Sequence, residues 1–269
     1  MDDTKIKIMG VLNVTPDSFS DGGLYASFET ACAQAEKMIA EGAAILDIGG
    51  ESTRPFSDPV STDEELKRVI PVIEAIRQKH DIPISIDTMK MEVAKKAIAA
   101  GATIINDVSA LRGDPRMGEL AADTRADVIL MHMQGTPADM QVKPTYDNVV
   151  EEIIDFFKER IDYALGCGIS RDRIIVDPGI GFGKNLAHNL SILKHLDRFA
   201  TLGLPVMLAH SRKRFLGEIT GVQAEIERDI ATAVVAAVCA AKTIDYVRVH
   251  DVATTRQAIR LAEAIDCAR

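Results

Sequence analysis

The 269-residue chain is 47% hydrophobic and carries a formal net charge of −9, so it is large enough for one barrel-sized domain or two small domains. Nucleic-acid-binding proteins are usually more basic, so we expect small-molecule partners and no nucleic acid. The N-terminus lacks the features of a signal peptide, no apolar run reaches membrane-spanning length, and the cysteines are scattered, which predicts a cytoplasmic protein with reduced thiols at Cys32, Cys167, Cys239 and Cys267.

Strand-like and helix-like segments alternate about eight times along the chain. The predicted strands cover residues 5–13, 43–48, 83–86, 102–105, 127–131, 174–176, 205–209 and 246–249. The predicted helices cover residues 28–41, 62–78, 90–100, 116–123, 148–165, 186–199, 228–241 and 254–264. This alternation is typical of a (β/α)8 TIM barrel, but it also allows a doubly wound parallel sheet.

Nearly every predicted strand ends in a polar or ionisable residue. These residues are Asn13, Asp47, Asp87, Asn106, His132, Asp177, Ser211 and His250. In a barrel they would converge on one mouth, whereas in an open sheet they would spread along an edge and only the switch point would bind a ligand. No change in composition and no linker divides the chain. We therefore predict a single (β/α)8 barrel domain over residues 1–269.

The sequence IIVDPGIGFGK at residues 174–184 is the most distinctive strand-to-helix junction. Asp177 ends the strand, and glycines at every second position let the backbone approach a flat ligand closely. The loop is not a P-loop, because Pro178 and Asn185 stand where that motif needs glycine and a hydroxyl residue. Taken alone, the pattern fits either a binding site or a plain tight turn.

Asp87, Asn106 and Asp177 are short side chains with oxygen acceptors at predicted strand ends. Such groups suit a flat ligand with several N–H donors, such as an aminopyrimidinone ring, because a carboxylate accepts two parallel hydrogen bonds from an amidine-like edge. For any one of the three, a helix cap or a satisfied turn is the alternative.

Four cationic candidates for an anionic group are Arg54, Lys213, Arg248 and His250. The loops after strands seven and eight of a barrel often form an anion site. Arg248 and His250 are two residues apart on one strand, so their side chains point to the same side. A charge inside an apolar strand needs a partner, which favours a site for Arg248. The run 212–214 also fits a solvated charge cluster.

Oxygen ligands of the kind that Mg²⁺ takes together with a phosphate occur in the first loop, at Asn13, Asp17 and Asp21. The sequence has no zinc-binding spacing and no Ser–His–Asp set that can be defended. The predicted chemistry is therefore one that needs no activated side-chain nucleophile.

Eight motifs stand in the order and at the spacings of a known enzyme family. They are GVLNVTPDSFSDGG, DIGGESTRP, SIDT, INDVSA, LMHMQG, DPGIGFGK, SRKRFLG and VRVHDV. With them the whole chain closely resembles the dihydropteroate synthases, pterin-binding enzymes of folate biosynthesis and targets of sulfonamide drugs. The resemblance implies a (β/α)8 barrel and a homodimer. It also implies a Mg²⁺-dependent transferase that joins 7,8-dihydropterin-6-ylmethyl diphosphate to 4-aminobenzoate, giving 7,8-dihydropteroate and diphosphate. Because diphosphate is a good leaving group once a metal and cations neutralise it, we predict an ordered, dissociative substitution.

The resemblance also implies roles for individual residues. The pterin contacts would be Asp87, Asn106, Asp177 and Lys213, which with Arg248 form the catalytic set. Arg248 would cover the ring and hold the diphosphate with His250, Asn13 and Arg54, and Asn13 would bind Mg²⁺. The 4-aminobenzoate contacts would be Thr53, Arg54, Phe182 and Ser211, with Phe19 and Asp21 from the first loop.

Two positions depart from the family pattern. Phe56 stands where glycine is common and alters the second loop, which bears on sulfonamide affinity. His210 precedes SRK, and we expect it to line the barrel rim.

The rival interpretations are a methyltransferase that binds a folate, and an inactive relative that only binds pterin. The motifs NVTPDSFSDGG and STRP argue against the first, and the complete set of motif residues argues against the second.

Overall fold

A computed structural model describes residues 4–15, 23–52, 59–136 and 139–268. The strands of this part are β1 Lys7–Asn13, β2 Ile45–Gly49, β3 Ile84–Asp87, β4 Ile104–Asp107, β5 Asp127–Met131, β6 Ile174–Asp177, β7 Met207–Leu208 and β8 Tyr246–Val249. The helices are α1 Gly23–Glu41, α2 Thr62–Arg77, α3 Met91–Ala99, α4 Met117–Thr124, α5 Val149–Gly166, α6 Leu186–Lys194, α7 Arg214–Thr220, α8 Asp229–Ala240 and α9 Val252–Asp266. Short 3-10 helices are η2 Arg171–Arg173, η3 Leu196–Leu202 and η4 Glu225–Arg228.

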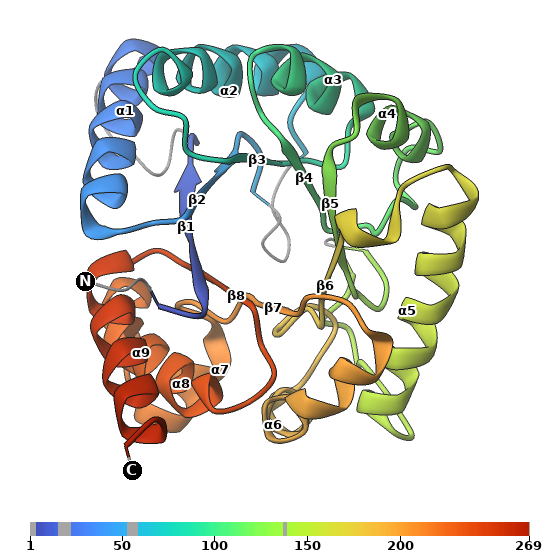
Figure 1. Cartoon of the computed structure of the whole chain (residues 1–269), viewed down its shortest axis with the longest axis vertical. Coiled ribbons are helices and arrows are strands. Elements are labelled where there is room, and N and C mark those ends of the chain that lie inside the picture. The colour runs from blue at the N-terminus through green and yellow to red at the C-terminus, as the bar shows by residue number, and fades with distance from the viewer. Residues whose placement is uncertain (1–3, 16–22, 53–58, 137–138, 269) are drawn as a thin grey trace.

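The eight strands form one sheet that closes on itself. Neighbouring strands pair in parallel in the order β6-β5-β4-β3-β2-β1-β8-β7. A parallel bridge between Val176 and Val206 joins the two ends, and the Val176 amide donates to the Pro205 carbonyl at 3.0 Å. Figure 1 shows the strands ringed by the helices. The predicted (β/α)8 barrel is confirmed, and the doubly wound alternative is wrong because the bridge between Val176 and Val206 closes the sheet.

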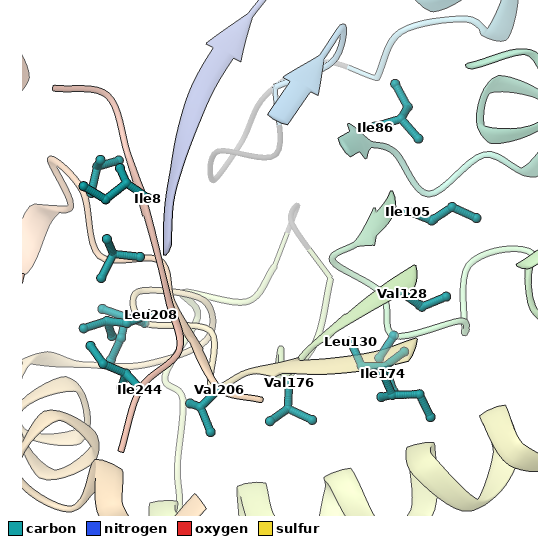
Figure 2. Packing of buried hydrophobic residues seen from close by; sticks show 14 of the residues in the cluster. Ile8, Ile86, Ile105, Val128, Leu130, Ile174, Val176, Val206, Leu208 and Ile244 are labelled. Carbon is teal, nitrogen blue, oxygen red and sulfur yellow. The ribbon is translucent and has the colours of Figure 1, made fainter. Parts of the chain in front are cut away.

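Alternate residues of the strands face opposite sides of the barrel wall, as the two-residue period of a strand requires. One set packs outward against the helices; Ile86, Ile105 and Val128 show this arrangement in Figure 2. The other set points into the barrel and forms a separate apolar layer of Met9, Ile45, Ile104, Ile129, Ile175, Met207 and Ala209. This inner layer closes the barrel interior below the carboxyl ends of the strands.

The largest differences from the predicted elements lie in the second half of the chain. Helix α6 stops at Lys194, because the His195 amide is shared between the Ser191 and Ile192 carbonyls and the chain tightens into η3. Strand β7 has only two residues, and the additional short helix α7 was not predicted. No helix in the described part of the chain is long and apolar enough to cross a membrane.

Candidate functional site

Arg248 lies inside the barrel and joins two buried carboxylates. Its Nε donates to Asp47 Oδ2 at 2.6 Å and its Nη2 to Asp87 Oδ2 at 2.7 Å. Asp47 comes from β2 and Asp87 from β3, so the guanidinium reaches across β1 from β8. Burial opposes the charge, but the two carboxylates outweigh it and raise the pKa of Arg248. The planar guanidinium is suited to such paired recognition and stays charged at any physiological pH.

Asp87 keeps one oxygen for a ligand. Its Oδ2 accepts from Arg248, while Oδ1 is buried without a hydrogen-bond partner in the described residues. Burial, opposed by Arg248 and reinforced by the negative charge of Asp47, raises the pKa of Asp87 to about 7. A buried acceptor without a partner is unfavourable, so we expect a bound ligand to supply the missing hydrogen-bond donor to this oxygen.

Asn106 stands next to Asp87 on the adjacent strand β4, since the two residues are register partners. Its Nδ2 donates to Asp47 Oδ2 at 3.2 Å, and the residue is only 3% exposed. Because the amide nitrogen is committed to Asp47, the orientation of the amide is fixed. The amide oxygen, like Asp87 Oδ1, is then an acceptor in the barrel mouth.

Asp177 ends β6 and folds back on the glycine loop that follows it. Its Oδ1 accepts from the Gly179 amide at 2.8 Å. Burial raises the pKa of Asp177, with Lys213 and Arg248 opposing the shift. Asp177 is the last residue of β6 and Arg248 is the next-to-last residue of the parallel strand β8, so both lie at the same end of the barrel, as the predicted common mouth requires.

Lys213 follows β7 and lies over the loop after β6. Its Nζ is 4.3 Å from the centre of the Phe182 ring and donates to the Ile180 carbonyl. A Cβ on Gly181, which has φ +81°, would lie 2.9 Å from Lys213 Cδ, so glycine gives the lysine stem its space. Burial lowers the pKa of Lys213 to about 7, with Asp177 opposing the shift.

Ser211 and His250 meet at the ends of β7 and β8. Ser211 Oγ and His250 Nδ1 are 2.9 Å apart, and the His250 amide donates to Ser211 Oγ at 3.2 Å. Both residues were predicted at the mouth, and the structure brings them together there with Arg248 two residues earlier on β8.

The basic run 212–214 is not one cluster. Arg212 turns away and forms two hydrogen bonds to Asp229, at 2.7 and 2.6 Å. The Arg214 side chain is 89% exposed and pairs with Glu218 on its own helix. Only Lys213 therefore enters the site, and the solvated-cluster interpretation holds for Arg214 alone.

His210 does not line the barrel rim, and the prediction that it does is wrong. The residue is fully buried, and its Nε2 lies 2.9 Å from the Thr232 carbonyl of α8. The physical reason is strand alternation: Leu208, two residues earlier, packs on the helix side, and so does His210. Burial lowers the pKa of His210 to about 4, so the imidazole is neutral at physiological pH.

Asn13 ends β1 and faces the same part of the mouth as Asp87. A Cβ on Gly49 would lie 3.7 Å from Asn13 Oδ1 and 3.5 Å from Asp87 Cβ. The side chains of Asn13 and Asp87 therefore flank this glycine on its two sides. In the described residues no group of three His, Cys, Asp or Glu side chains is arranged to hold a metal ion. The predicted site residues Thr53, Arg54, Phe19 and Asp21, together with Asp17 and Phe56, lie outside the described residues.

Sequence reasoning gave no role to Asp47, although it was among the predicted strand-end residues. Its carboxylate is fully buried, accepts from Arg248 and Asn106, and has one oxygen without a partner in the described chain. The apolar wall beside Phe182 was also missed; it consists of Val108, Met131, Met133 and Met140, with Met89. The inward orientation of Met131 could have been predicted, because Met131 stands two residues after the inward-facing Ile129 on the same strand.

The raised pKa of Asp87 predicts how stability depends on pH. Because the folded-state value of about 7 exceeds the ordinary 3.8, the folded protein binds this proton more tightly than the unfolded chain. Stability from this group is therefore lost as pH rises from about 4 to about 7, by up to about 4 kcal/mol. Urea unfolding across this range is expected to show a flatter pH dependence for Asp87→Asn than for the wild type. Parallel profiles would contradict the assignment.

Comparison with known proteins places this geometry among pterin-binding proteins. Residues 9–250 match the family model described as "Pterin binding enzyme". The dihydropteroate synthase of Escherichia coli (strain K12) is 47% identical over 259 residues, which are 96% of this chain and 90% of that protein.

Solved structures agree with the sequence match. The dihydropteroate synthase of Xanthomonas albilineans with 4-aminobenzoic acid superposes with a TM-score of 0.93 at 45% identity, covering 98% of this chain and 94% of that one. The same enzyme in complex with 7,8-dihydropteroate superposes with a TM-score of 0.90 at 43% identity, covering 98% and 95% of the two chains.

Proposed function

Since this chain belongs to the pterin-binding enzyme family, as a transferase of the dihydropteroate synthase type, we propose that it joins 7,8-dihydropterin-6-ylmethyl diphosphate to 4-aminobenzoate. The products are 7,8-dihydropteroate and diphosphate. The observation that carries the proposal is that one barrel mouth holds both the buried acceptor Asp87 Oδ1, which has no partner in the described residues, and the Arg248 cation, which is bound to Oδ2 of the same carboxylate.

The pterin ring is bound by the acceptors of β3, β4 and β6. Asp87 Oδ1, the Asn106 amide oxygen and Asp177 match the N–H groups along an aminopyrimidinone edge. The flat apolar faces of the ring pack on the wall of Met131 and Val108. This division of polar edge and apolar face is the usual construction of a site for a planar heterocycle.

The diphosphate tail lies toward β7 and β8. The His250–Ser211 pair stands at this side of the mouth, where barrel enzymes commonly bind phosphate. Arg248 extends from β8 across β1 toward Asp47 and Asp87, so its cation lies between the pterin acceptors and the diphosphate. The C–O bond to the diphosphate breaks with its electron pair on the leaving oxygen, and the cations stabilise that charge. The pterin-methyl cation that remains is delocalised into the ring and stabilised by the surrounding carboxylates.

The second substrate attacks from the open side of the mouth. Phe182 and Ser211 offer an aromatic face and a hydroxyl there, and Thr53, Arg54, Phe19 and Asp21 complete the predicted 4-aminobenzoate contacts. The arylamine lone pair forms the new C–N bond, and the nitrogen then passes its extra proton to the released diphosphate or to water. A dissociative substitution of this kind requires no protein nucleophile.

Mg²⁺ fits at Asn13 in this proposal. Magnesium commonly takes one or two protein oxygens and fills its remaining positions with substrate phosphate and water. Asn13 Oδ1 lies beside Gly49, next to Asp87, at the mouth. When bound, the ion would neutralise diphosphate charge; the positioning of the pterin remains the task of Asp87, Asn106 and Asp177.

We also propose that the chain forms a homodimer through α8. Four exposed apolar side chains recur every fourth residue from η4 along this helix: Ile226 (67% exposed), Ile230 (73%), Val234 (56%) and Val238 (65%). Residues four apart lie on one helical face, so they form a continuous apolar stripe. A second copy presenting the same stripe would bury both, as a two-fold interface requires.

The proposal places the protein in the cytoplasm. The four cysteines form no disulfide, and unpaired thiols are the usual state in that compartment.

Replacing Asp87 by alanine is expected to abolish pterin binding together with turnover. Loss of the charge-assisted hydrogen bond that Oδ1 would accept predicts at least about a tenfold weaker affinity, and the unpaired Arg248 cation weakens binding further. The measurements are calorimetric binding of the pterin diphosphate and diphosphate release with 4-aminobenzoate, with Asp155→Ala on the outer face of α5 as the control. Normal affinity and turnover in Asp87→Ala would contradict the role, and a wild type that binds pterin without releasing diphosphate would contradict the reaction.

Asn13→Ala is expected to raise the Mg²⁺ concentration needed for half-maximal substrate binding about tenfold, equivalent to about 1.4 kcal/mol. The readout is calorimetric affinity for the pterin diphosphate across a Mg²⁺ titration, which does not depend on turnover. An unchanged Mg²⁺ dependence would show that Asn13 is not a ligand.

Val234→Glu is expected to convert the dimer to a monomer, because a charge would be buried against its own copy across the two-fold axis. Analytical ultracentrifugation of the wild type, this variant and the control Leu165→Glu on α5 tests the proposal. A monomeric wild type, or a dimeric Val234→Glu, would refute the interface.

A further inference from the structure

The loop between β6 and α6 is held by its carbonyl groups. Four consecutive carbonyls each accept a hydrogen bond from a side chain, and three of these side chains come from other parts of the chain. Lys213 donates to Ile180, Gln141 to Gly181 at 2.5 Å, Lys184 to Phe182 at 2.8 Å and Tyr146 to Gly183 at 2.9 Å. A loop that carries Phe182 into the mouth is therefore fixed at every residue around it.

Lys184 is the central member of this group, because it joins two loops. In addition to the Phe182 carbonyl, its Nζ lies 3.0 Å from His132 Nδ1 and 3.3 Å from the His132 carbonyl at the end of β5. A lysine ammonium has three N–H donors and no acceptor, and the structure supplies three acceptors. Burial lowers the pKa of His132 to about 2, so the imidazole is neutral and Nδ1 is able to accept.

The two loops approach so closely that only glycine is accommodated between them. A Cβ on Gly179, which has φ +68°, would lie 2.0 Å from the His132 carbonyl oxygen, and one on Gly183 would lie 2.6 Å from the Gln134 carbonyl oxygen. The Nζ of Lys184 donates to one carbonyl of each loop, that of His132 and that of Phe182, and so satisfies both.

A lysine at this buried position is unfavourable for stability unless its hydrogen bonds to the two loops serve a function. It is 3% exposed and forms no ion pair with a described carboxylate, and burial lowers its pKa well below the ordinary value. Burial of a group of this kind lowers stability. Proteins retain such groups mainly at functional sites.

We propose that Lys184 is a positioning residue that ties the loop after β5 to the loop after β6 and thereby fixes the Phe182 ring for the second substrate. The inference rests on the proposed function, in which Phe182 contacts 4-aminobenzoate. Lys184 itself touches the Phe182 backbone and not the substrate. Its loss therefore affects binding of 4-aminobenzoate, while the acceptors of the pterin on β3 and β4 stay in place.

Steady-state kinetics of Lys184→Met with both substrates varied tests the proposal. We expect KM for 4-aminobenzoate to rise about tenfold, equivalent to about 1.4 kcal/mol, with KM for the pterin diphosphate changed less than about threefold. Tyr146→Phe removes only the hydroxyl that donates to the Gly183 carbonyl and is expected to shift the same constant about threefold. Lys158→Met, at a surface lysine of α5, is the matched control.

Each outcome decides one question. Unchanged KM values for 4-aminobenzoate in folded Lys184→Met and Tyr146→Phe would overturn the positioning role, and so would equal losses for both substrates. If Lys184→Met does not fold, Lys184→Gln, which keeps an N–H donor on a shorter side chain, decides by the same criterion. A wild type without turnover would instead refute the proposed function, so the two failures are distinguishable.

Discussion

The structure depends on one partly buried cation inside the barrel, that of Arg248. Arg248 stands on an inner strand position, where an isolated charge would be strongly unfavourable, and it is stabilised by Asp47 and Asp87 from two other strands. The three groups come from separate parts of the sequence and meet only when the barrel closes. Because the carboxylates share one guanidinium, each keeps an oxygen without a partner in the described residues, and the interior of the fold becomes a site for a ligand with N–H donors.

Strand alternation explains why the polar groups collect at one end. The inner positions Ile45, Ile104 and Ile175 form an apolar layer, and two residues later on the same strands come Asp47, Asn106 and Asp177. On each of these strands, the next inward-facing position after the apolar layer is therefore a polar residue at the mouth. The apolar layer keeps water out from below, so the charges above it interact in surroundings of low polarity and more strongly than in water.

Much of this arrangement was predictable from the sequence. Parallel strands that end in Asp87, Asn106 and Asp177 have to converge in a barrel, and Arg248 inside an apolar strand had to find a partner. The partner Asp47 was not predictable from pattern alone, because it depends on how far a guanidinium reaches across β1. The side-chain positions of His210 and Arg212 were also not predictable from the sequence. The position of His210 depends on which residues of the two-residue strand β7 face inward. That of Arg212 depends on its left-handed backbone conformation, with φ 58°. The role of Lys184 at the end of the DPGIGFGK motif was not predictable, since two of its three acceptors are backbone carbonyls and the third, His132 Nδ1, lies 52 residues away in the sequence.

The most direct test of the account is a crystal structure of the chain with a non-reactive 7,8-dihydropterin bound. The account predicts the ring in the barrel mouth, with its N–H edge about 3 Å from Asp87 Oδ1, Asp177 along the same edge and the Arg248 guanidinium beside the ring. A pterin bound anywhere else, or an Asp87 Oδ1 that stays without a partner in the complex, would contradict it.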